Sequence, residues 1–200
     1  MTTALIIIDP QVDFCPGGAL AVADGDAIMP VINAMMPKFD HVVVTQDWHP
    51  AGHSSFASAH EGAAPFSQIE MAYGPQTLWP DHCVIGTGGA ALHPALALDP
   101  AAAIIRKGSN PAVDSYSAFF ENDKETATGL AGLLRDRGVD HLTMVGLATD
   151  YCVAWSALDA VRLGFAVQVD LAACRAIDLD GSCATAVTEM DDAGITLIGG

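Results

Sequence analysis

The sequence predicts an α/β fold in which helices flank a doubly wound, mostly parallel sheet. Short apolar runs rich in β-branched residues recur along the chain and alternate with stretches of helical character. These apolar runs are continuous rather than alternating, which is typical of strands covered on both faces, as in a parallel sheet. We therefore expect a single layered domain over residues 1–200.

Six apolar runs are the expected strands. They are ALIII (4–8), HVVVTQ (41–46), AAIIRK (102–107), HLTMVG (141–146), FAVQVDL (165–171) and ITLIG (195–199). The expected helices are Asp26–Phe39, Thr126–Arg137, Asp150–Leu163 and Asp180–Ala193. Polar or acidic residues at helix starts, and a glycine just past the last three ends, are usual helix punctuation. Residues 48–87 have no sustained period, and a loop of that length in a compact domain is often functional.

Charge and composition exclude several classes of protein. The net charge of -16 repels phosphate backbones and anionic membrane surfaces, so neither nucleic acid nor membrane is expected as a partner. The N-terminal apolar run stops at Asp9 and has no basic segment before it, so we expect a cytoplasmic protein without a signal or transmembrane segment. Five cysteines without a CxxC pair indicate neither a disulfide framework nor a thiolate zinc cluster. The odd number of cysteines leaves open that at least one thiol is present for its reactivity.

Side chains with catalytic chemistry follow several expected strands. Asp9 follows the first strand, Lys107 ends the third, and Cys152 opens the helix after the fourth. Ligands of open α/β sheets bind outside the carboxyl ends of the strands, so we expect these side chains at one edge of the sheet. Taken singly, each has an ordinary interpretation: a turn carboxylate, a solvated lysine and a small buried thiol. Their common placement favours a functional site.

Cys152 is the best candidate for a nucleophile. Thr149 or Asp150 is expected to cap the helix and leave Cys152 in its first turn, where free N–H groups and the helix dipole favour a thiolate. Lys107 would add positive charge, and Asp9 would accept the thiol proton. Backbone N–H groups at the turn into the helix would receive a developing oxyanion.

A second group has the chemistry of a metal site. Asp47 and His49 lie two residues apart, on one side of an extended segment, and His82 stands near the far end of the long loop. Such an oxygen and nitrogen ligand set suits zinc, iron(II) or manganese(II). Seven histidines in 200 residues also give pairings by chance, so the metal site is a hypothesis. His53 stays open as a further ligand or a supporting residue.

The motifs that hold these residues occur in the order of a known family. They are IIIDPQVDFCPGGAL, TQDWHPAGHSSF, LWPDHCV, RKGSNPAVDSYSAFF and GLATDYCVAWSALDA. On these motifs the chain resembles, almost end to end, the nicotinamidases (pyrazinamidases) of the isochorismatase-like hydrolase superfamily. Five ordered motifs are far more specific than any single one.

The resemblance implies roles for individual residues. Asp9, Lys107 and Cys152 would form a catalytic triad, with the backbone N–H groups of Ala148 and Cys152 as an oxyanion hole and a cis peptide before Ala148. One divalent metal ion, zinc, iron or manganese, would have as its ligands Asp47, His49 and His82. His53 or a nearby serine stays open as an additional ligand. The ring-stacking pair would be Phe14 and Trp79, which spacing alone explains equally well as core aromatics.

The implied activity is the hydrolysis of nicotinamide to nicotinate and ammonia through a Cys152 thioester, in NAD salvage, with pyrazinamide as a second substrate. One alternative is a relative that acts on another small amide, such as a carbamoyl or ureido compound, or on a vinyl ether. Another is a redox-sensing or metal-binding module without turnover. Retention of Lys107 and Asp9 argues against the module, because a sensor needs a low thiol pKa but no proton shuttle. A homo-oligomer is left open by the sequence.

Overall fold

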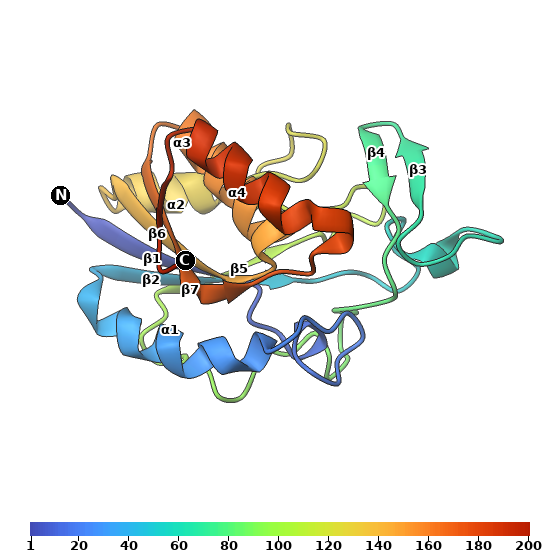
Figure 1. Ribbon diagram of the computed structural model, residues 1–200, viewed down its shortest axis with the longest axis horizontal. Helices are drawn as coiled ribbons and strands as arrows, with labels where there is room; N and C mark the ends of the chain where they lie inside the picture. The colour runs from blue at the N-terminus through green and yellow to red at the C-terminus, as the bar shows by residue number, and fades with distance from the viewer.

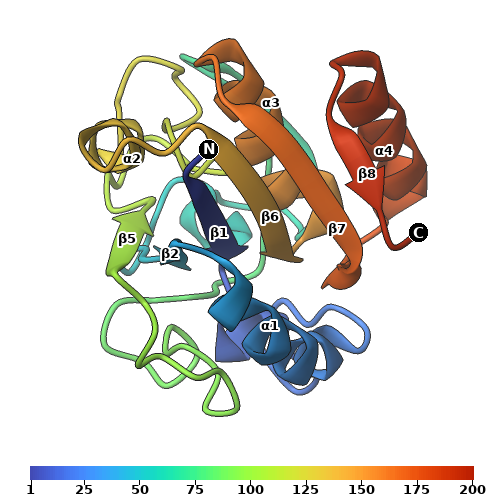
Figure 2. The same cartoon turned by 90° about the vertical axis from the view of Figure 1, so that its left-hand side faces the viewer.

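The centre of the computed structural model, which describes residues 1–200, is a six-stranded sheet (Figure 1). Its strands are β1 (Thr3–Ile8), β2 (His41–Asp47), β5 (Ala103–Lys107), β6 (His141–Leu147), β7 (Ala166–Arg175) and β8 (Thr196–Ile198). All neighbouring strands are parallel, in the order β5-β2-β1-β6-β7-β8 (Figure 2). The predicted doubly wound parallel sheet is therefore confirmed.

Four α-helices connect the strands of this sheet. They are α1 (Met29–Met35), α2 (Leu130–Asp136), α3 (Ala154–Arg162) and α4 (Ser182–Asp192). Helix α1 covers one face, and α2, α3 and α4 lie over the other (Figures 1 and 2). Short 3₁₀ turns, Gly25–Ile28 and Met36–Lys38, extend α1 over almost all of its predicted range. None of the four helices has the length and apolar character needed to cross a bilayer.

Helix α2 begins four residues later than predicted. The expected start, Thr126, is instead held in a turn by Asp123, whose carboxylate accepts hydrogen bonds from the Thr126 N–H at 2.9 Å and its hydroxyl at 2.7 Å. Side chains of this kind compete with the helix by bonding nearby backbone. The helix therefore begins only at Leu130, although the helical sequence pattern begins at Thr126.

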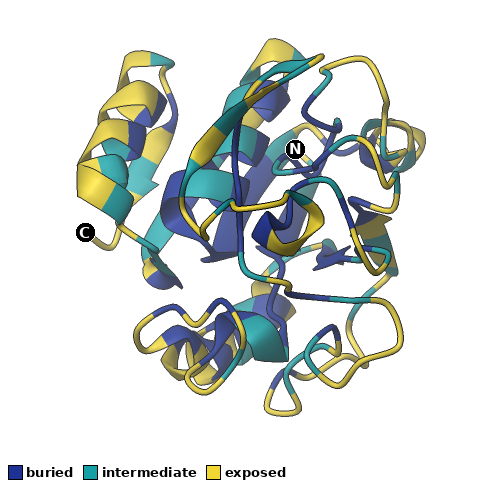
Figure 3. Cartoon of the chain, turned by 90° about the vertical axis from the view of Figure 1, so that its right-hand side faces the viewer, coloured by how far each residue is buried: buried dark blue, intermediate teal, exposed yellow.

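The core lies at the centre of the sheet, and its edges are open. Residues Ala4–Ile8 of β1 have no exposed surface, and buried residues concentrate between the helical layers (Figure 3). Strand β5 is an edge strand with alternating burial, and Ile104 on it is 47% exposed. The prediction that every apolar run is covered on both faces is therefore wrong for β5 and for the other edge strand, β8.

The long segment predicted as a loop contains an antiparallel hairpin, β3 (Gln68–Met71) and β4 (Gly74–Thr77). It projects from the end of the molecule to which β1 and β2 run (Figure 1). Its strands are four residues long, and β4 begins Gly-Pro, a pair depleted in strands. The sequence therefore carried no strand signal here.

The order of the strands fixes where a ligand can bind. The chain runs from β1 outward to β2 and β5, then returns to place β6 on the other side of β1. Such a reversal leaves a crevice outside the carboxyl ends of the two central strands. The residues that follow β1 and β6 meet at this crevice.

Candidate active site

Three reactive side chains enter the crevice from different elements. Asp9 follows β1 directly, with a positive φ of 45°, and Lys107 is the last residue of β5. Cys152 lies in a π-helical turn, Thr149–Val153, that leads into α3. Short π-helical segments are rare and often occur at functional sites.

The three side chains meet around the Lys107 ammonium. Its Nζ lies 2.9 Å from Oδ2 of Asp9 and 3.5 Å from Sγ of Cys152. Sγ of Cys152 and a carboxylate oxygen of Asp9 lie within 4.8 Å of each other. All three residues are buried. An acid or base, a cation and a thiol are thus within reach of one substrate atom.

Burial sets the protonation of the carboxylate and the thiol. Burial raises the pKa of Asp9 to about 6, against the opposing effects of Lys107 and the Thr45 hydroxyl. Burial also raises the pKa of the Cys152 thiol well above its usual value, and Lys107 only partly offsets this. At neutral pH burial therefore favours a protonated thiol beside an ionised carboxylate, and it opposes the thiolate that the helix start was expected to favour.

The predicted capping of this helix is also wrong. Neither Thr149 nor Asp150 caps the turn with its side chain. The Asp150 carboxylate instead accepts hydrogen bonds from the N–H groups of Ile177 and Asp178 and from the Ser182 hydroxyl, at 3.0, 2.7 and 2.5 Å. Asp150 thereby ties the Cys152 turn to the segment before α4.

The peptide before Ala148 is cis, as the family resemblance implied. The Ala148 carbonyl accepts hydrogen bonds from the N–H groups of Tyr151 and Val153, which closes the turn around Cys152. The N–H of Ala148 itself donates to no acceptor in the protein. An unused backbone donor beside a nucleophile has the chemistry of an oxyanion hole.

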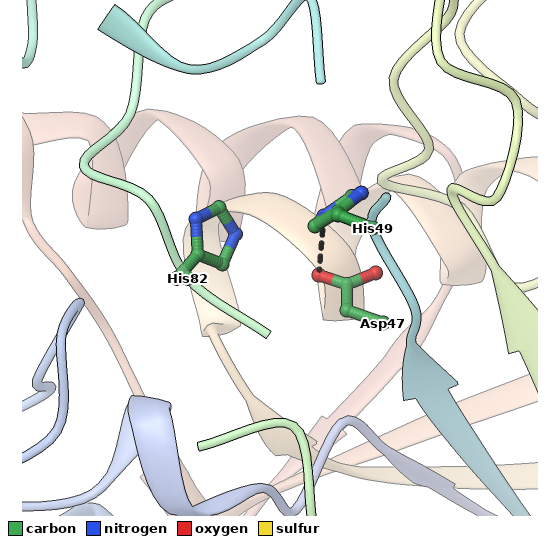
Figure 4. Close-up of side chains that lie close together, drawn as sticks. All are labelled: Asp47, His49 and His82. Atoms are coloured by element: carbon green, nitrogen blue, oxygen red, sulfur yellow. Dashed lines mark ion pairs between the residues drawn. The ribbon is translucent and has the colours of Figure 1, made fainter. Parts of the chain in front are cut away.

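Asp47, His49 and His82 form a second buried cluster (Figure 4). One ligand atom from each lies within 4.8 Å of the other two. Nδ1 of His49 lies 2.9 Å from the Gly108 carbonyl, and Nδ1 of His82 lies 2.8 Å from the Pro80 carbonyl. Because a carbonyl only accepts hydrogen bonds, both Nδ1 atoms carry hydrogen, and the Nε2 lone pairs are left for a ligand.

The chemistry of this cluster fits a cation. Nε2 of His49 is buried without a hydrogen-bond partner and lies 3.6 Å from Oδ2 of Asp47. Burial lowers the pKa of His82 to about 4, and neighbouring His49 adds to this, so His82 is a neutral ligand. Gly108 permits the geometry, because a Cβ there would lie 2.5 Å from Cε1 of His49. Although burial opposes it, the Asp47 carboxylate raises the pKa of His49. Two imidazoles and a carboxylate suit a divalent metal ion such as zinc.

Lys107 joins the two clusters. Its Nζ also lies 2.5 Å from Oδ1 of Asp47 and 2.7 Å from the Ser115 carbonyl. Although burial opposes a charged lysine, Asp47 and Asp9 keep the pKa of Lys107 well above its usual value. No local sequence pattern pairs a strand-end lysine with a distant carboxylate, so this link was not predicted.

His53 is occupied by other partners. Its Nδ1 lies 2.8 Å from the Ser55 hydroxyl and its Nε2 lies 2.8 Å from the Asn110 carbonyl. It lies beside the metal-type cluster, with its ring centroid 4.6 Å from that of His49. Both nitrogens of His53 have partners within the protein, but ligand atoms of His49, His53 and Asp114 also lie within 4.8 Å of one another, so His53 stays a candidate for a further ligand.

Phe14 and Trp79 line a cavity that reaches Cys152 and His82. Five further residues of its wall were not predicted from the sequence: Leu20, Asp114, Tyr116, Tyr151 and Ile177. Most of these come from segments whose apolar residues are indistinguishable in sequence from core. A cavity lined by aromatic side chains between a thiol and a metal-type cluster can hold a small ring with a reactive substituent.

Known proteins match this chain over nearly its whole length. The isochorismatase domain model matches residues 3–199. A nicotinamidase of Acinetobacter baylyi is 54% identical over 98% of this chain and 91% of its own length. A nicotinamidase of Escherichia coli is 47% identical over 97% of this chain and 93% of its own.

Solved structures are similar over the same length. A nicotinamidase/pyrazinamidase of Acinetobacter baumanii, 52% identical, has a TM-score of 0.97 over 98% of this chain and 95% of its own. A yeast nicotinamidase bound to the inhibitor nicotinaldehyde, 28% identical, has a TM-score of 0.92 over 100% of both chains. A Pyrococcus horikoshii pyrazinamidase in complex with zinc, 37% identical, has a TM-score of 0.80 over 99% of both. The thiol, the cluster of imidazoles and the match over nearly the whole chain lead to one conclusion: the protein belongs to the isochorismatase family.

Proposed function

We propose that this protein is a nicotinamidase that hydrolyses nicotinamide to nicotinate and ammonia. The observation that carries the proposal is the convergence of Asp9 and Lys107 on Cys152, which lines a cavity bordered by Asp47 and His82. Relatives named nicotinamidase, alike over nearly the whole chain, support the same substrate. Pyrazinamide, an amide on a similar ring, is the second substrate we expect.

Cys152 attacks the carboxamide carbon, and the C–S bond forms as Asp9 takes the thiol proton. A carboxylate with a pKa of about 6 is suited to this exchange near neutral pH. The oxyanion of the tetrahedral intermediate accepts hydrogen bonds from the N–H groups of Ala148 and Cys152. The positive charge of Lys107, 3.5 Å from Sγ of Cys152, offsets the negative charge that the sulfur gains as its proton leaves.

Collapse of the intermediate breaks the C–N bond, and Asp9 returns its proton to the departing ammonia. Asp9 then takes a proton from the water that attacks the thioester. Release of nicotinate breaks the C–S bond, and the proton on Asp9 returns to the Cys152 sulfur. One carboxylate thus serves both half-reactions.

Asp47, His49 and His82 would hold a divalent metal ion, for which zinc is our first choice because it suits this ligand set. When bound, the ion would supply a Lewis acid that holds the nitrogen of the ring and orients the amide. Phe14 and Trp79 would flank the ring. A role in NAD salvage and a cytoplasmic location follow from this activity as expectations.

The test is ammonia release from nicotinamide by the purified protein, with Cys152→Ala as the control. We expect release by the wild type and none above background by the variant. Release from benzamide, which lacks the ring nitrogen, should be far slower. A protein that releases ammonia from ureido compounds but not from nicotinamide would belong to another branch of the family.

A further inference from the structure

Gln76, on strand β4 of the unforeseen hairpin, lies buried behind the wall of the cavity. Its Nε2 lies 3.0 Å from the Tyr116 hydroxyl oxygen, 2.8 Å from Oδ2 of Asp114 and 2.7 Å from the Thr77 carbonyl. Tyr116 and Asp114 both line the cavity, whereas Gln76 does not reach it. Gln76 thus contacts the wall from the outside.

The orientation of the Gln76 amide is fixed by the chemistry of its neighbours. The Asp114 carboxylate and the Thr77 carbonyl only accept hydrogen bonds, so the NH₂ group must face them. The amide oxygen faces two donors, the Tyr73 hydroxyl at 3.0 Å and Nδ2 of Asn122 at 3.4 Å. Every polar atom of this buried side chain is therefore partnered in only one orientation.

The Tyr116 hydroxyl links Gln76 to the opposite part of the wall. The two N–H groups of Gln76 have three acceptors, so one N–H is shared between the Tyr116 oxygen and another of them. It also accepts a hydrogen bond from Nε1 of Trp79 at 3.1 Å. The rings of Trp79 and Tyr116 meet edge to face, and each meets Tyr151 in the same way. The hydroxyl oxygen is thus the point at which the hairpin amide and the indole are joined.

We propose that Gln76 is a positioning residue for the ring-binding pocket, acting through Tyr116 on the orientation of Trp79. The proposal rests on the proposed function, in which Trp79 flanks the substrate ring. Gln76 makes no hydrogen bond or ion pair with Cys152, Asp9 or Lys107. Its loss should therefore weaken binding of the ring and leave the chemical step intact, a KM effect without a matching kcat effect.

The test variant is Gln76→Met, which keeps the length of the side chain and removes the amide. We expect KM for nicotinamide to rise about tenfold, with kcat within about twofold of wild type. The matched control is Thr77→Val, the next residue of β4, whose side chain makes no hydrogen bond. Its KM should equal that of wild type. A wild-type KM in Gln76→Met overturns the proposal.

A spectroscopic measurement separates positioning from general loosening. The chain has three tryptophans, Trp48, Trp79 and Trp155, so 5-fluorotryptophan labelling gives three ¹⁹F resonances, and Trp79→Phe identifies the one from Trp79. Gln76→Met should move or broaden the Trp79 resonance and leave that of Trp48 in place. An unmoved Trp79 resonance in the folded variant overturns the proposal, whatever the kinetics.

A second variant keeps the test open if Gln76→Met does not fold. Tyr116→Phe removes the oxygen that joins Gln76 to Trp79, yet leaves the bonds from Gln76 to Asp114 and Thr77. It should shift the Trp79 resonance in the same direction, and where both variants fold, their KM effects should be less than additive. Full additivity would mean that Gln76 does not act through Tyr116. Absence of nicotinamide hydrolysis by the wild type would refute the proposed function alone, because the ¹⁹F measurement needs no turnover.

Discussion

The ammonium nitrogen of Lys107 lies 2.9 Å from Oδ2 of Asp9, and neither side chain is exposed to solvent. Two opposing effects act on the pKa of Asp9: burial raises the pKa of a carboxyl group, and a neighbouring cation lowers it. Burial prevails, and the pKa of Asp9 stands at about 6. The carboxylate is therefore a stronger base than an ordinary aspartate and is still ionised at neutral pH.

This pKa predicts how the rate depends on pH. Only the ionised Asp9 can accept the thiol proton, so kcat/KM should be level near neutral pH and fall about tenfold for each pH unit below about 6. The measurement is a pH profile of ammonia release, with circular dichroism at each pH to establish that the protein is folded. A rate that stays level down to about pH 4.5 in folded protein would mean that Asp9 is not the base.

Cys152→Ser should lose at least about a thousandfold in ammonia release, because a serine hydroxyl is far less acidic than a thiol. The fold should be unchanged, since the substitution is nearly isosteric. The control is Cys183→Ser, on helix α4, which should retain wild-type activity. Near-wild-type turnover by the Cys152 variant would refute the thioester mechanism.

Much of the fold could be predicted because the strand signal is a simple one. Five continuous residues of β1, Ala4–Ile8, are fully buried, and such a run has few other interpretations. The hairpin could not be predicted, because β4 contains Gly-Pro and is stabilised by tertiary contacts of Gln76. The start of α2 was misplaced because Asp123 captures Thr126 in a turn.

The site was predictable where residue type and strand position coincide. Asp9 and Lys107 stand at strand ends, and parallel topology brings such ends together. The protonation of Cys152 was not predictable, because it depends on burial that no local pattern encodes. The partners of Asp150 were not predictable either, because its carboxylate accepts hydrogen bonds from residues 27 to 32 positions away in the sequence.

Removal of metal should abolish turnover or raise KM with little change in secondary structure. Asp47, His49 and His82 occupy loop and strand-end positions and do not belong to the hydrophobic core. The measurement is chelation followed by circular dichroism, ammonia release and elemental analysis. His82→Gln should behave like the chelated protein, and the matched control His141→Gln, at the start of β6, like wild type. Active protein without any bound metal would contradict this prediction.

Asp150→Ala should reduce stability and substrate binding together. The substitution leaves the N–H groups of Ile177 and Asp178 without their acceptor, which costs about 2–4 kcal/mol of unfolding free energy. Because Ile177 lines the cavity, KM should rise as well. Urea unfolding and steady-state kinetics measure the two effects. Asp136→Ala, an exposed residue at the end of α2, is the control and should change neither.

Lys107→Met and Asp9→Asn should separate the charge that lowers the thiol pKa from the base that takes its proton. In Lys107→Met the cation is lost, so the pKa of Cys152 should rise further and iodoacetamide should label it more slowly near neutral pH. The same variant leaves Asp9 and Asp47 buried without their cation, which should cost about 3–5 kcal/mol of stability.

In Asp9→Asn the effect on labelling has the opposite sign. Removing a nearby negative charge lowers the pKa of Cys152, because Asp9 raises it, so labelling should be as fast as in wild type or faster. Turnover should nevertheless fail and no thioester should accumulate, since an amide can neither take the thiol proton nor deliver it to ammonia. Labelling of the two variants and wild type over roughly pH 5 to 9, read by mass spectrometry, distinguishes the roles. Lys124→Met, which removes the solvent-accessible lysine of an ion pair with the buried Asp159, is the control. If Lys107→Met is folded and labels as fast as wild type throughout, Lys107 does not stabilise the thiolate. Its contribution is then limited to its ion pairs with Asp9 and Asp47.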